Sequence, residues 1–455
     1  MSGEDRRLEC AMDRSVAEGA LATVMGSLLG GIFLTAFALK LGATRLQIGI
    51  LSALPTLANA AQFAGAYLVA SSGRSRAVCL VGTWTARLLW IPAVLVPLLV
   101  PHWSGPQQAW CVIAILGLGN LFAAVGGVAW LEWIQRLIPV NRRIDFFGRR
   151  NLYNSALTLG MSLGGALLVE GWARFSGAPE GGFLIVFGVA IACGLVGLVI
   201  LGKIPAADSP RPTTSRGLSS LTGPFRDRDF RRLLVAYGSW NLASQLATPF
   251  FAVYMLERLR ISFGVVTALA TFGSLLGLAT NGFWTRLKVR YGVRPVVLLA
   301  SLGDALLPFC WLFVTPQWLW LLIPVHAFAI FNPPLTMGPH NFLLKLTSER
   351  GCAPFLASYN ACTGTLAALG AILGGALASE FQGVWTAGPI QFTGMQLLFF
   401  LSGVGRLVSL RLLAGITEPE AQSVRLVLTH LLNRSRTPEP ATLPLEPAET
   451  HHQAA

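Results

Sequence analysis

The sequence predicts an all-α polytopic membrane protein, in which twelve transmembrane helices form two six-helix bundles related by a pseudo-two-fold axis. Its 455 residues have a mean hydropathy of +0.60, and 12% of them are charged. A soluble domain carries about 25% charged residues. Few soluble folds could bury this much apolar surface, so composition alone favours a membrane protein. Apolar windows, the distribution of arginine and an internal repeat then define the topology.

Twelve windows are long and apolar enough to cross a bilayer, which takes about 20 helical residues. Their expected limits are 15–40, 46–71, 77–100, 108–137, 151–175, 182–203, 232–256, 262–284, 294–315, 317–343, 353–379 and 390–415. The long polar linker at 204–231 divides the windows six and six. We therefore expect a short N-terminal segment at 1–14, bundles at 15–203 and 232–416, and a partly disordered tail at 417–455.

Basic residues are distributed unequally between the two sides of this arrangement. If loops and ends alternate between sides, 27 of the 34 lysines and arginines lie on the side of the N-terminus and 5 on the other, and Arg87 and Arg406 lie within spans. Cytoplasmic loops carry such an excess of positive charge. We expect an inner-membrane protein with both termini and the linker in the cytoplasm. The net charge of +13 then reflects topology and headgroup contact, not nucleic-acid binding.

The two halves also echo each other in sequence. The stretch RLQIG at 45–49 resembles RISFG at 260–264, and each leads into the second span of its half. The stretch LGGAL occurs at 163–167 in span five and again at 373–377 in span eleven. Repeated halves around a central site are a common plan of secondary transporters.

The turns after spans two and eight resemble those of the major facilitator superfamily, whose signature there is roughly G-x-x-x-D-R-x-G-R. Ala70 and Val289 stand where the aspartate is expected, and four residues match: Gly73, Arg74, Arg290 and Gly292. The resemblance implies a secondary transporter that moves a small solute by alternating access, with these four residues in cytoplasmic gating turns. Because the family's aspartate helps to latch the halves, its loss leaves open a non-transporting scaffold or assembly factor on the same fold. The stretches 146–151 and 240–256 resemble a bacterial branch without an assigned substrate.

Polar residues at mid-depth are the candidates for a substrate cavity, which in this family is lined by spans one, four, seven and ten. An amide facing lipid leaves its donors unpaired, so these side chains should face the interior. The alternative for each is a hydrogen bond between helices, and for His326 also a proton-carrying role. Pro333 and Pro334 should break span ten at that point. The candidates are Asn120, Asn154, Asn241, Gln245, His326, Asn332 and Asn360.

Three charges lie deep within spans: Arg87, Asp304 and Arg406. A charge at the bilayer centre costs at least about 2.5–3.5 kcal/mol, so each is a functional candidate. Asp304 and Arg406 lie at matching depths, and we predict that they pair, as a structural clamp or as a proton-coupling site. Arg87 has no acid at its depth, so we expect it to bond to backbone or to Gln62, or to snorkel. We expect the glutamates near the span ends to be solvated or at headgroup level: Glu18, Glu132, Glu170, Glu257 and Glu380.

The loop between spans four and five, NRRIDFFGRRN at 141–151, is the most basic turn. Its arginines, including Arg149 and Arg150, are predicted to anchor the turn among anionic headgroups. Asp145 is a candidate local acid that ties this loop to Arg74 or Arg149. The stretch SVRLVLTHLLNR at 423–434 predicts a short amphipathic helix lying on the membrane.

Several classes of function lack their sequence signals. The chain has no GxxxxGK[ST] phosphate loop, no HExxH and no catalytic constellation, so we expect neither an enzyme nor an ATP-driven pump. The seven cysteines are scattered, which predicts no metal site and no disulfide framework. We expect a monomer in the bilayer that uses no cofactor and binds a small solute, with the need for a coupling ion left open.

Overall fold

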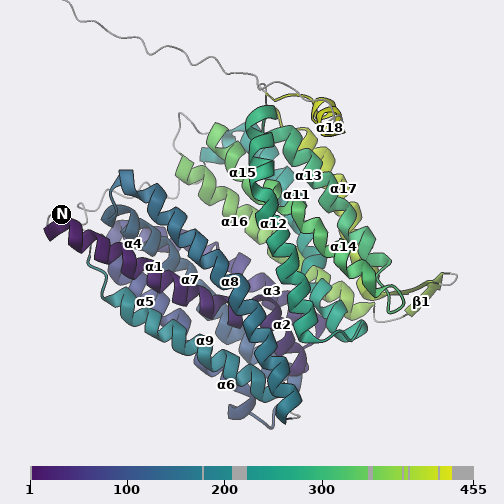
Figure 1. Ribbon diagram of the computed structural model, residues 1–455, viewed down its shortest axis with the longest axis horizontal. Helices are drawn as coiled ribbons and strands as arrows, with labels where there is room; N and C mark the ends of the chain where they lie inside the picture. The colour runs from purple at the N-terminus through teal and green to yellow at the C-terminus, as the bar shows by residue number, and fades with distance from the viewer. Residues whose placement is uncertain are drawn as a thin grey trace, which may run out of the picture.

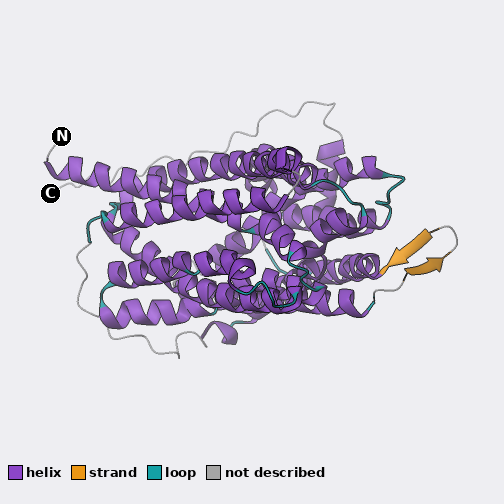
Figure 2. Cartoon of the chain, turned by 90° about the horizontal axis from the view of Figure 1, so that it is seen from below, coloured by secondary structure: helices purple, strands orange, loops and turns teal. Residues whose placement is uncertain are grey.

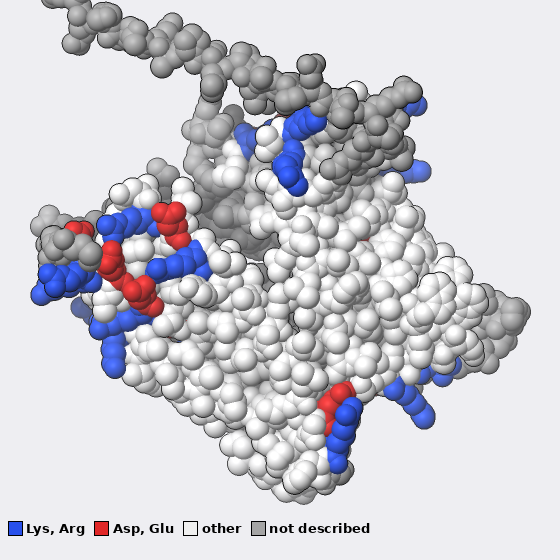
Figure 3. Space-filling model, viewed as in Figure 1, with Lys and Arg blue, Asp and Glu red and all other residues white. Residues whose placement is uncertain are grey.

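The structure, a computed structural model, describes residues 3–176, 179–206, 223–346, 352–381, 384–387, 390–418 and 421–432. Nearly all of these residues are helical, and the chain forms two bundles side by side (Figure 1). We call the end that carries the N-terminus the arginine-rich face, and the opposite end, with Lys40, Arg45, Arg174, Arg258 and Arg260, the arginine-poor face. Figure 3 shows a broad belt without charged side chains between charged ends, as a membrane protein requires.

The first bundle contains spans one to six, and three of these spans are kinked. Spans one to three are each made of two helices: α1 (Gly3–Leu29) with α2 (Gly31–Lys40), α3 (Arg45–Ala58) with α4 (Ala61–Ser72), and α5 (Ser75–Leu88) with α6 (Trp90–Leu99). Spans four to six are α7 (Gly105–Leu137), α8 (Val140–Ser176) and α9 (Pro179–Gly202). The helix α1 begins well before the expected start of span one at residue 15, so the polar N-terminal segment extends the helix beyond the apolar region.

The second bundle contains spans seven to twelve. A 3-10 turn, η1 (Gly223–Arg226), precedes span seven, which is α11 (Arg228–Val253) with a π-helical end, η2 (Tyr254–Arg258). Spans eight and nine are α12 (Phe263–Tyr291) and α13 (Val293–Leu312). Span ten follows the 3-10 turn η3 (Leu319–Leu321), and spans eleven and twelve are α16 (Cys352–Glu380) and α17 (Gly394–Ala414). Among the described residues, ten helical segments are long and apolar enough to cross a membrane, and the kinked pair α3–α4 and α11 complete the twelve.

Span ten is broken in the turn directly before its two prolines, whose missing N–H groups cannot bond the carbonyls of that turn. It consists of α14 (Leu322–Ala327), a 3-10 turn η4 (Phe328–Phe331) and α15 (Asn332–Leu346). Pro333 and Pro334 lie in the first turn of α15, where a missing N–H costs nothing because that N–H would have no helical partner. The break therefore precedes Asn332. The carbonyl of Ile330, within the break, accepts a hydrogen bond of 2.6 Å from the Trp284 indole.

A short hairpin departs from the all-helical pattern. Strands β1 (Val384–Ala387) and β2 (Ile390–Thr393) pair antiparallel between α16 and α17, with Val384 opposite Thr393. Figure 2 shows this hairpin standing away from the helices at the end opposite the N-terminus. The hydropathy pattern did not predict it.

The tail forms the predicted short helix, α18 (Val424–Leu432), but this helix is not free on a membrane surface. Val427 is fully buried and belongs to an apolar cluster with Trp284, Tyr291 and Val296. Leu426 and Leu428 remain exposed on the outer side. The helix therefore packs on the ends of α12 and α13 at the arginine-rich face.

The two bundles meet through α3 against α16 and α8 against α12. The Arg45 guanidinium donates to the carbonyl of Ala378 at 3.0 Å, and the backbone N–H of Leu46 donates to the Ser379 hydroxyl at 3.1 Å. Along α8 and α12, the backbone N–H of Gly264 donates to the Glu170 carboxylate at 2.8 Å. All these contacts lie at the arginine-poor face, and within the described ranges no hydrogen bond or ion pair joins the bundles at the arginine-rich face.

Candidate functional site

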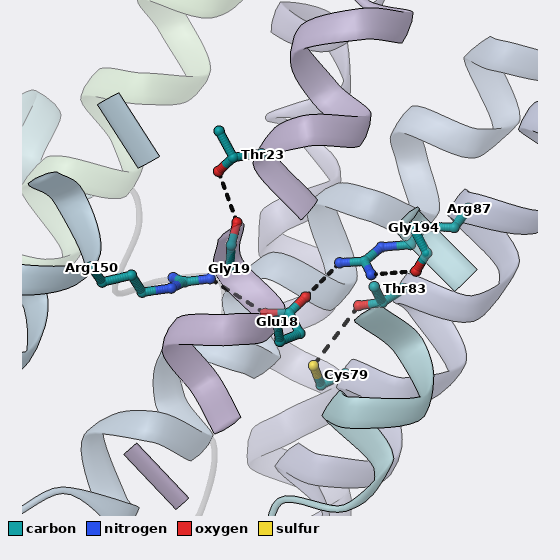
Figure 4. Close-up of polar contacts among 8 residues, drawn as sticks. All are labelled: Glu18, Gly19, Thr23, Cys79, Thr83, Arg87, Arg150 and Gly194. Carbon is teal, nitrogen blue, oxygen red and sulfur yellow. Dashed lines mark hydrogen bonds and ion pairs between the residues drawn. The ribbon is translucent and has the colours of Figure 1, made fainter. Parts of the chain in front are cut away.

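A buried charge cluster lies inside the first bundle, where α1, α5 and α8 approach one another (Figure 4). Glu18 on α1 places one carboxylate oxygen 2.5 Å from the Arg87 guanidinium and the other 3.4 Å from that of Arg150. A second nitrogen of Arg87 donates to the carbonyl of Gly194 on α9 at 2.9 Å. The Glu18 side chain is 4% exposed, so the carboxylate is tolerable there only because both arginines accompany it.

Trp130 on α7 fixes the second arginine. The guanidinium carbon of Arg150 lies 4.0 Å from the centre of the Trp130 ring, close enough for a strong cation–π contact. The two arginines are therefore held differently. Arg87 is bound tightly to Glu18 and to backbone, whereas Arg150 makes a longer contact with Glu18 and stacks on an aromatic face.

The cluster lines a cavity of about 350 Å³ between α1, α5, α7 and α8. Polar walls come from Glu18, Thr83, Arg87, Asn120, Trp130 and Arg150, and much of the remaining wall is apolar or glycine, for example Met25, Leu29 and Gly126. This volume is in the range that holds a small organic molecule.

Two hydrogen-bond donors in this cavity have no acceptor. The Nε atom of Arg150 and the Nε1 atom of Trp130 are both buried and have no partner among the described residues. Since nine in ten or more buried polar groups in proteins are satisfied, two orphaned donors side by side are unusual.

The sequence did not predict this cluster. Glu18 was expected at a membrane edge, and that expectation is wrong because α1 continues unbroken past it and carries it among α5, α7 and α8. Arg87 was expected to lack an acidic partner, which is also wrong. The partners lie 69 and 132 residues from Glu18, so no local pattern could have revealed them.

A second cavity of about 360 Å³ lies between the two bundles. Its polar side chains come from α8, α12 and α15, and no aromatic side chain lines it. They are Ser155, Thr158, Ser274, Asn281, Asn332 and Thr336. The predicted candidate Asn332 thus lies in a cavity shared by both halves.

The other predicted amides have varied surroundings. Asn120 lines the first cavity, and its amide donates to Leu116 O of its own helix at 2.8 Å. Asn241 similarly donates to Tyr237 O at 2.7 Å, so neither makes the bond between helices that was the alternative. Asn154 keeps a buried oxygen without a donor. Gln245 and Asn360 are half-buried, with no side-chain hydrogen bond to a described residue.

His326 is placed by its own helix and by an aromatic ring. Its Nδ1 atom lies 2.7 Å from Leu322 O, and its ring packs edge-on against Trp311 at 5.8 Å. It lines neither of the two cavities above.

Asp304 and Arg406 pair as predicted. An Arg406 nitrogen lies 2.7 Å from Oδ2 of Asp304 and also donates to the Asp304 carbonyl at 2.9 Å. Both residues are buried between α13 and α17, and neither lines the two cavities. The geometry is that of a clamp between two spans.

The basic loop at 141–151 is bound by α1. Arg149 pairs with Asp13 at 2.7 Å, and Arg142 lies 3.7 Å from Glu9. Asp145 is exposed and has no partner among the described residues, so the hypothesis that it ties the loop to Arg74 or Arg149 is wrong. An acidic edge of α1 meets the basic start of α8 instead.

Comparison with known families decides the classification. The model of the Major Facilitator Superfamily matches residues 19–337. The chain belongs to the major facilitator superfamily. It is therefore a multi-pass membrane protein of a transporter family. No protein of curated function matches the chain in sequence.

Solved structures of superfamily transporters share the fold. A mutant of the nucleoside transporter NupG superimposes with a TM-score of 0.67 at 10% identity, covering 90% of this chain and 100% of that one. A bacterial homologue of the iron transporter ferroportin, in an inward-facing state, gives 0.65 at 14% identity, with 91% and 99% covered. A bacterial homologue of the lysosomal transporter Spinster, inward-facing and occupied, gives 0.63 at 12%, with 92% and 98% covered. At these identities the likeness is one of fold alone.

The two turns that carry the superfamily signature are built differently here. Gly73 ends α4 with φ 64°, and Gly292 precedes α13 with φ 93°, which are conformations that favour glycine. In the first turn, no side chain caps the start of α5 after the exposed Arg74. In the second, where Arg290 stacks near Tyr291, a carboxylate from the tail caps α13: Glu418 accepts hydrogen bonds from the backbone N–H groups of Val293 and Arg294.

Proposed function

We propose that this protein is a secondary transporter that carries a small solute across the inner membrane by alternating access. The observation that supports this most is that, within the described ranges, the hydrogen bonds between the bundles lie at the arginine-poor face and none lies at the arginine-rich face, while a cavity with polar side chains lies between the bundles. A protein that keeps one conformation would gain stability from contacts between the bundles at both faces.

The positive-inside rule predicts which face of the molecule is cytoplasmic. It assigns the arginine-rich face, with both termini, to the cytoplasm. Under this proposal the arrangement corresponds to an inward-open state, and the contacts of Arg45 and Leu46 with α16 close its outer end.

The scaffold alternative rests on Ala70 and Val289, which replace the signature aspartates. A protein without transport has no need of a cavity, and its centre could be filled with aromatic side chains. The cavity between the bundles has no aromatic side chain among its lining residues, and half of these residues carry a hydroxyl or an amide group. We therefore place transport first.

Accessibility of the central cavity tests the proposal without knowledge of the solute. In a background without its seven cysteines, Ser155→Cys reports on the cavity between the bundles. A membrane-impermeant maleimide should label it rapidly from the cytoplasmic side and also, more slowly, from the outside. Asp145→Cys, exposed at the arginine-rich face, is the matched control and should react from the cytoplasm only.

A cross-link then distinguishes alternation from leakage. Leu46 and Ser379 are adjacent across the outer contact. A disulfide between Leu46→Cys and Ser379→Cys should abolish labelling of Ser155→Cys from outside and leave cytoplasmic labelling intact. If Ser155→Cys reacts from one side only, with or without the cross-link, alternating access is excluded and the scaffold becomes the better explanation.

A further inference from the structure

We propose that the cavity around Glu18 is a binding site for a small organic oxyanion, and that Arg150 and Trp130 are the groups that recognise it. The biological role of this site rests on the proposed transport function, but the binding experiment that tests it does not. The site has three properties that together point to this class of ligand: its charge, its unused donors and the composition of its walls.

The charge of the cavity is unbalanced. Among its described lining residues, the charged side chains are Glu18, Arg87 and Arg150, which leaves one positive charge in excess. An uncompensated charge away from water is costly, and a bound anion would neutralise it. A neutral or cationic ligand would leave the excess in place or increase it.

The unused donors show where the anion would sit. Arg150 Nε and Trp130 Nε1 are buried without acceptors, and the two side chains stack at 4.0 Å. An oxyanion with two oxygens can accept from both, which a hydrocarbon cannot do. Charge-assisted hydrogen bonds of this kind are among the strongest in proteins.

Glu18 acts in this site as an internal counter-ion. Its contact with Arg87 is short at 2.5 Å, whereas its contact with Arg150 is 3.4 Å. The ligand would therefore displace Glu18 from Arg150 and leave the Glu18–Arg87 pair intact. Arg87 is a positioning residue, because it is held by Glu18 and Gly194 and has its donors directed to them.

The walls indicate an organic body on the anion. Beyond the polar cluster the cavity is bounded by Met25, Leu29, Trp90 and Leu116, and by small residues of α7. These surfaces suit a compact apolar group, such as one aromatic ring, in a volume of about 350 Å³.

Binding to the purified full-length protein in detergent tests the inference. The probes are phenylacetate and phenyl phosphate, with phenylacetamide and phenethylammonium as neutral and cationic counterparts. Calorimetry and thermal stabilisation should detect at least one of the two anions and neither counterpart. Preference for one anion identifies carboxylate or phosphate as the recognised group.

Variants assign the binding to these residues. Arg150→Gln should weaken binding on the order of tenfold or more, and Trp130→Phe, which keeps the ring and removes the donor, by several-fold. Arg149→Gln is the matched control, because Arg149 is exposed and pairs with Asp13, and it should bind as the unmodified protein does. Glu18→Gln should bind the anion more tightly, since the competitor is neutralised. A purely structural Glu18 would lower thermal stability without raising affinity.

Two results would overturn the inference: no binding of either anion, or equal loss of binding in Arg149→Gln and Arg150→Gln. Because this assay needs no movement of the bundles, it can fail while Ser155→Cys still shows alternating access. Conversely, if the protein binds the anion but Ser155→Cys is labelled from one side only, the binding site is supported and the proposed transport function is excluded.

Discussion

The predicted intramembrane charges Arg87, Asp304 and Arg406 each have an ion-pair partner among the described residues, and Asp304 with Arg406 is the most enclosed case. Both ends of this pair are buried, and the arginine also bonds to the backbone of the aspartate. Removing one member of such a pair leaves the other charge unpaired in an apolar region, which costs about 3–5 kcal/mol in proteins.

Asp304→Ala should therefore lower the free energy of unfolding by about 3–5 kcal/mol, seen as a large fall in thermal unfolding temperature in detergent. Asp145→Ala, at an exposed site without a described partner, should leave it unchanged. The double variant Asp304→Leu with Arg406→Met should recover most of the loss, because it removes both charges. If the double variant is as unstable as the single one, the pair is not a clamp and the charges have another role.

Matching depth was sufficient to predict this pair and insufficient to predict the Glu18 cluster. Asp304 and Arg406 each lie well inside an apolar window, so their depths could be counted from the span ends. Glu18 lies close to the polar start of the chain, and counting placed it at the surface. Its burial depends on how α1 packs against α5 and α8, which is information about neighbours that a single sequence does not contain.

The tail is the element whose role the structure changes most. Glu418 is nearly enclosed: it bonds to the start of α13 and lies 2.5 Å from the ammonium of Lys345 at the end of α15. Gln422 donates its backbone N–H to Tyr291 O at 3.0 Å, and Val427 of α18, five residues further along the chain, is buried against Tyr291 and its neighbours. One acid thus joins the tail, span nine and span ten at the turn where the family's aspartate is missing.

This contact has a predictable dependence on pH. Burial alone would raise the pKa of Glu418, but Lys345 and the N–H groups of Arg294 and Val293 outweigh it and hold the pKa below its ordinary value of 4.5. A lowered pKa means that the stabilisation is complete above pH 4.5 and disappears as the pH falls through the lower folded value. Hydrogen exchange of α18 should be slow and constant from pH 7 to 5, after correction for intrinsic rates, and faster below that range.

Glu418→Gln should give the fast exchange of α18 already at pH 7, by roughly tenfold, because a charge-assisted contact is replaced by a neutral one. Glu132→Gln, which alters an ordinary exposed pair with Arg136, is the control and should leave α18 protected. Equal protection of α18 in both variants would show that Val427, and not Glu418, holds the tail.

Periodicity and turn residues predicted which segments are helical, but not where each helix ends. The break of span ten lies at Phe328–Phe331, before the prolines, since proline is accepted in the first turn of α15. The N-terminal segment continues α1 because its acids meet the arginines of α8, a contact between residues more than 100 positions apart. Such ends are determined by neighbouring helices.

For the whole molecule, the unequal distribution of basic residues predicted an arginine-rich and an arginine-poor face, and the LGGAL echo indicated two related halves. The echo did not predict that its two copies would be used differently. Gly165, the equivalent position in the first half, lies against the side chains of Leu28 and Phe33 of its own bundle. Gly375 in the second half lies directly against the backbone of Arg45 and Leu46, so the outer contact between the bundles depends on the absence of a side chain there.

The outer contact at Gly375 provides a test variant for the conformational equilibrium, and the first LGGAL copy provides its control. A Cβ atom on Gly375 would come within 2.8 Å of the Arg45 carbonyl, and one on Gly49 within 2.4 Å of the Ala371 carbonyl, so the outer end could not close as it does here.

Gly375→Val should shift the population toward an outward-open state. It should raise the labelling of Ser155→Cys from outside by several-fold and lower it from the cytoplasm. Gly164→Val is the control: it places the same side chain at the preceding glycine of the first LGGAL copy, with nothing within 4 Å, and it should leave both rates as they were. Unequal effects of the two valines would show that the Gly375 contact governs the closed outer end, whereas equal effects would show that helix propensity alone is responsible.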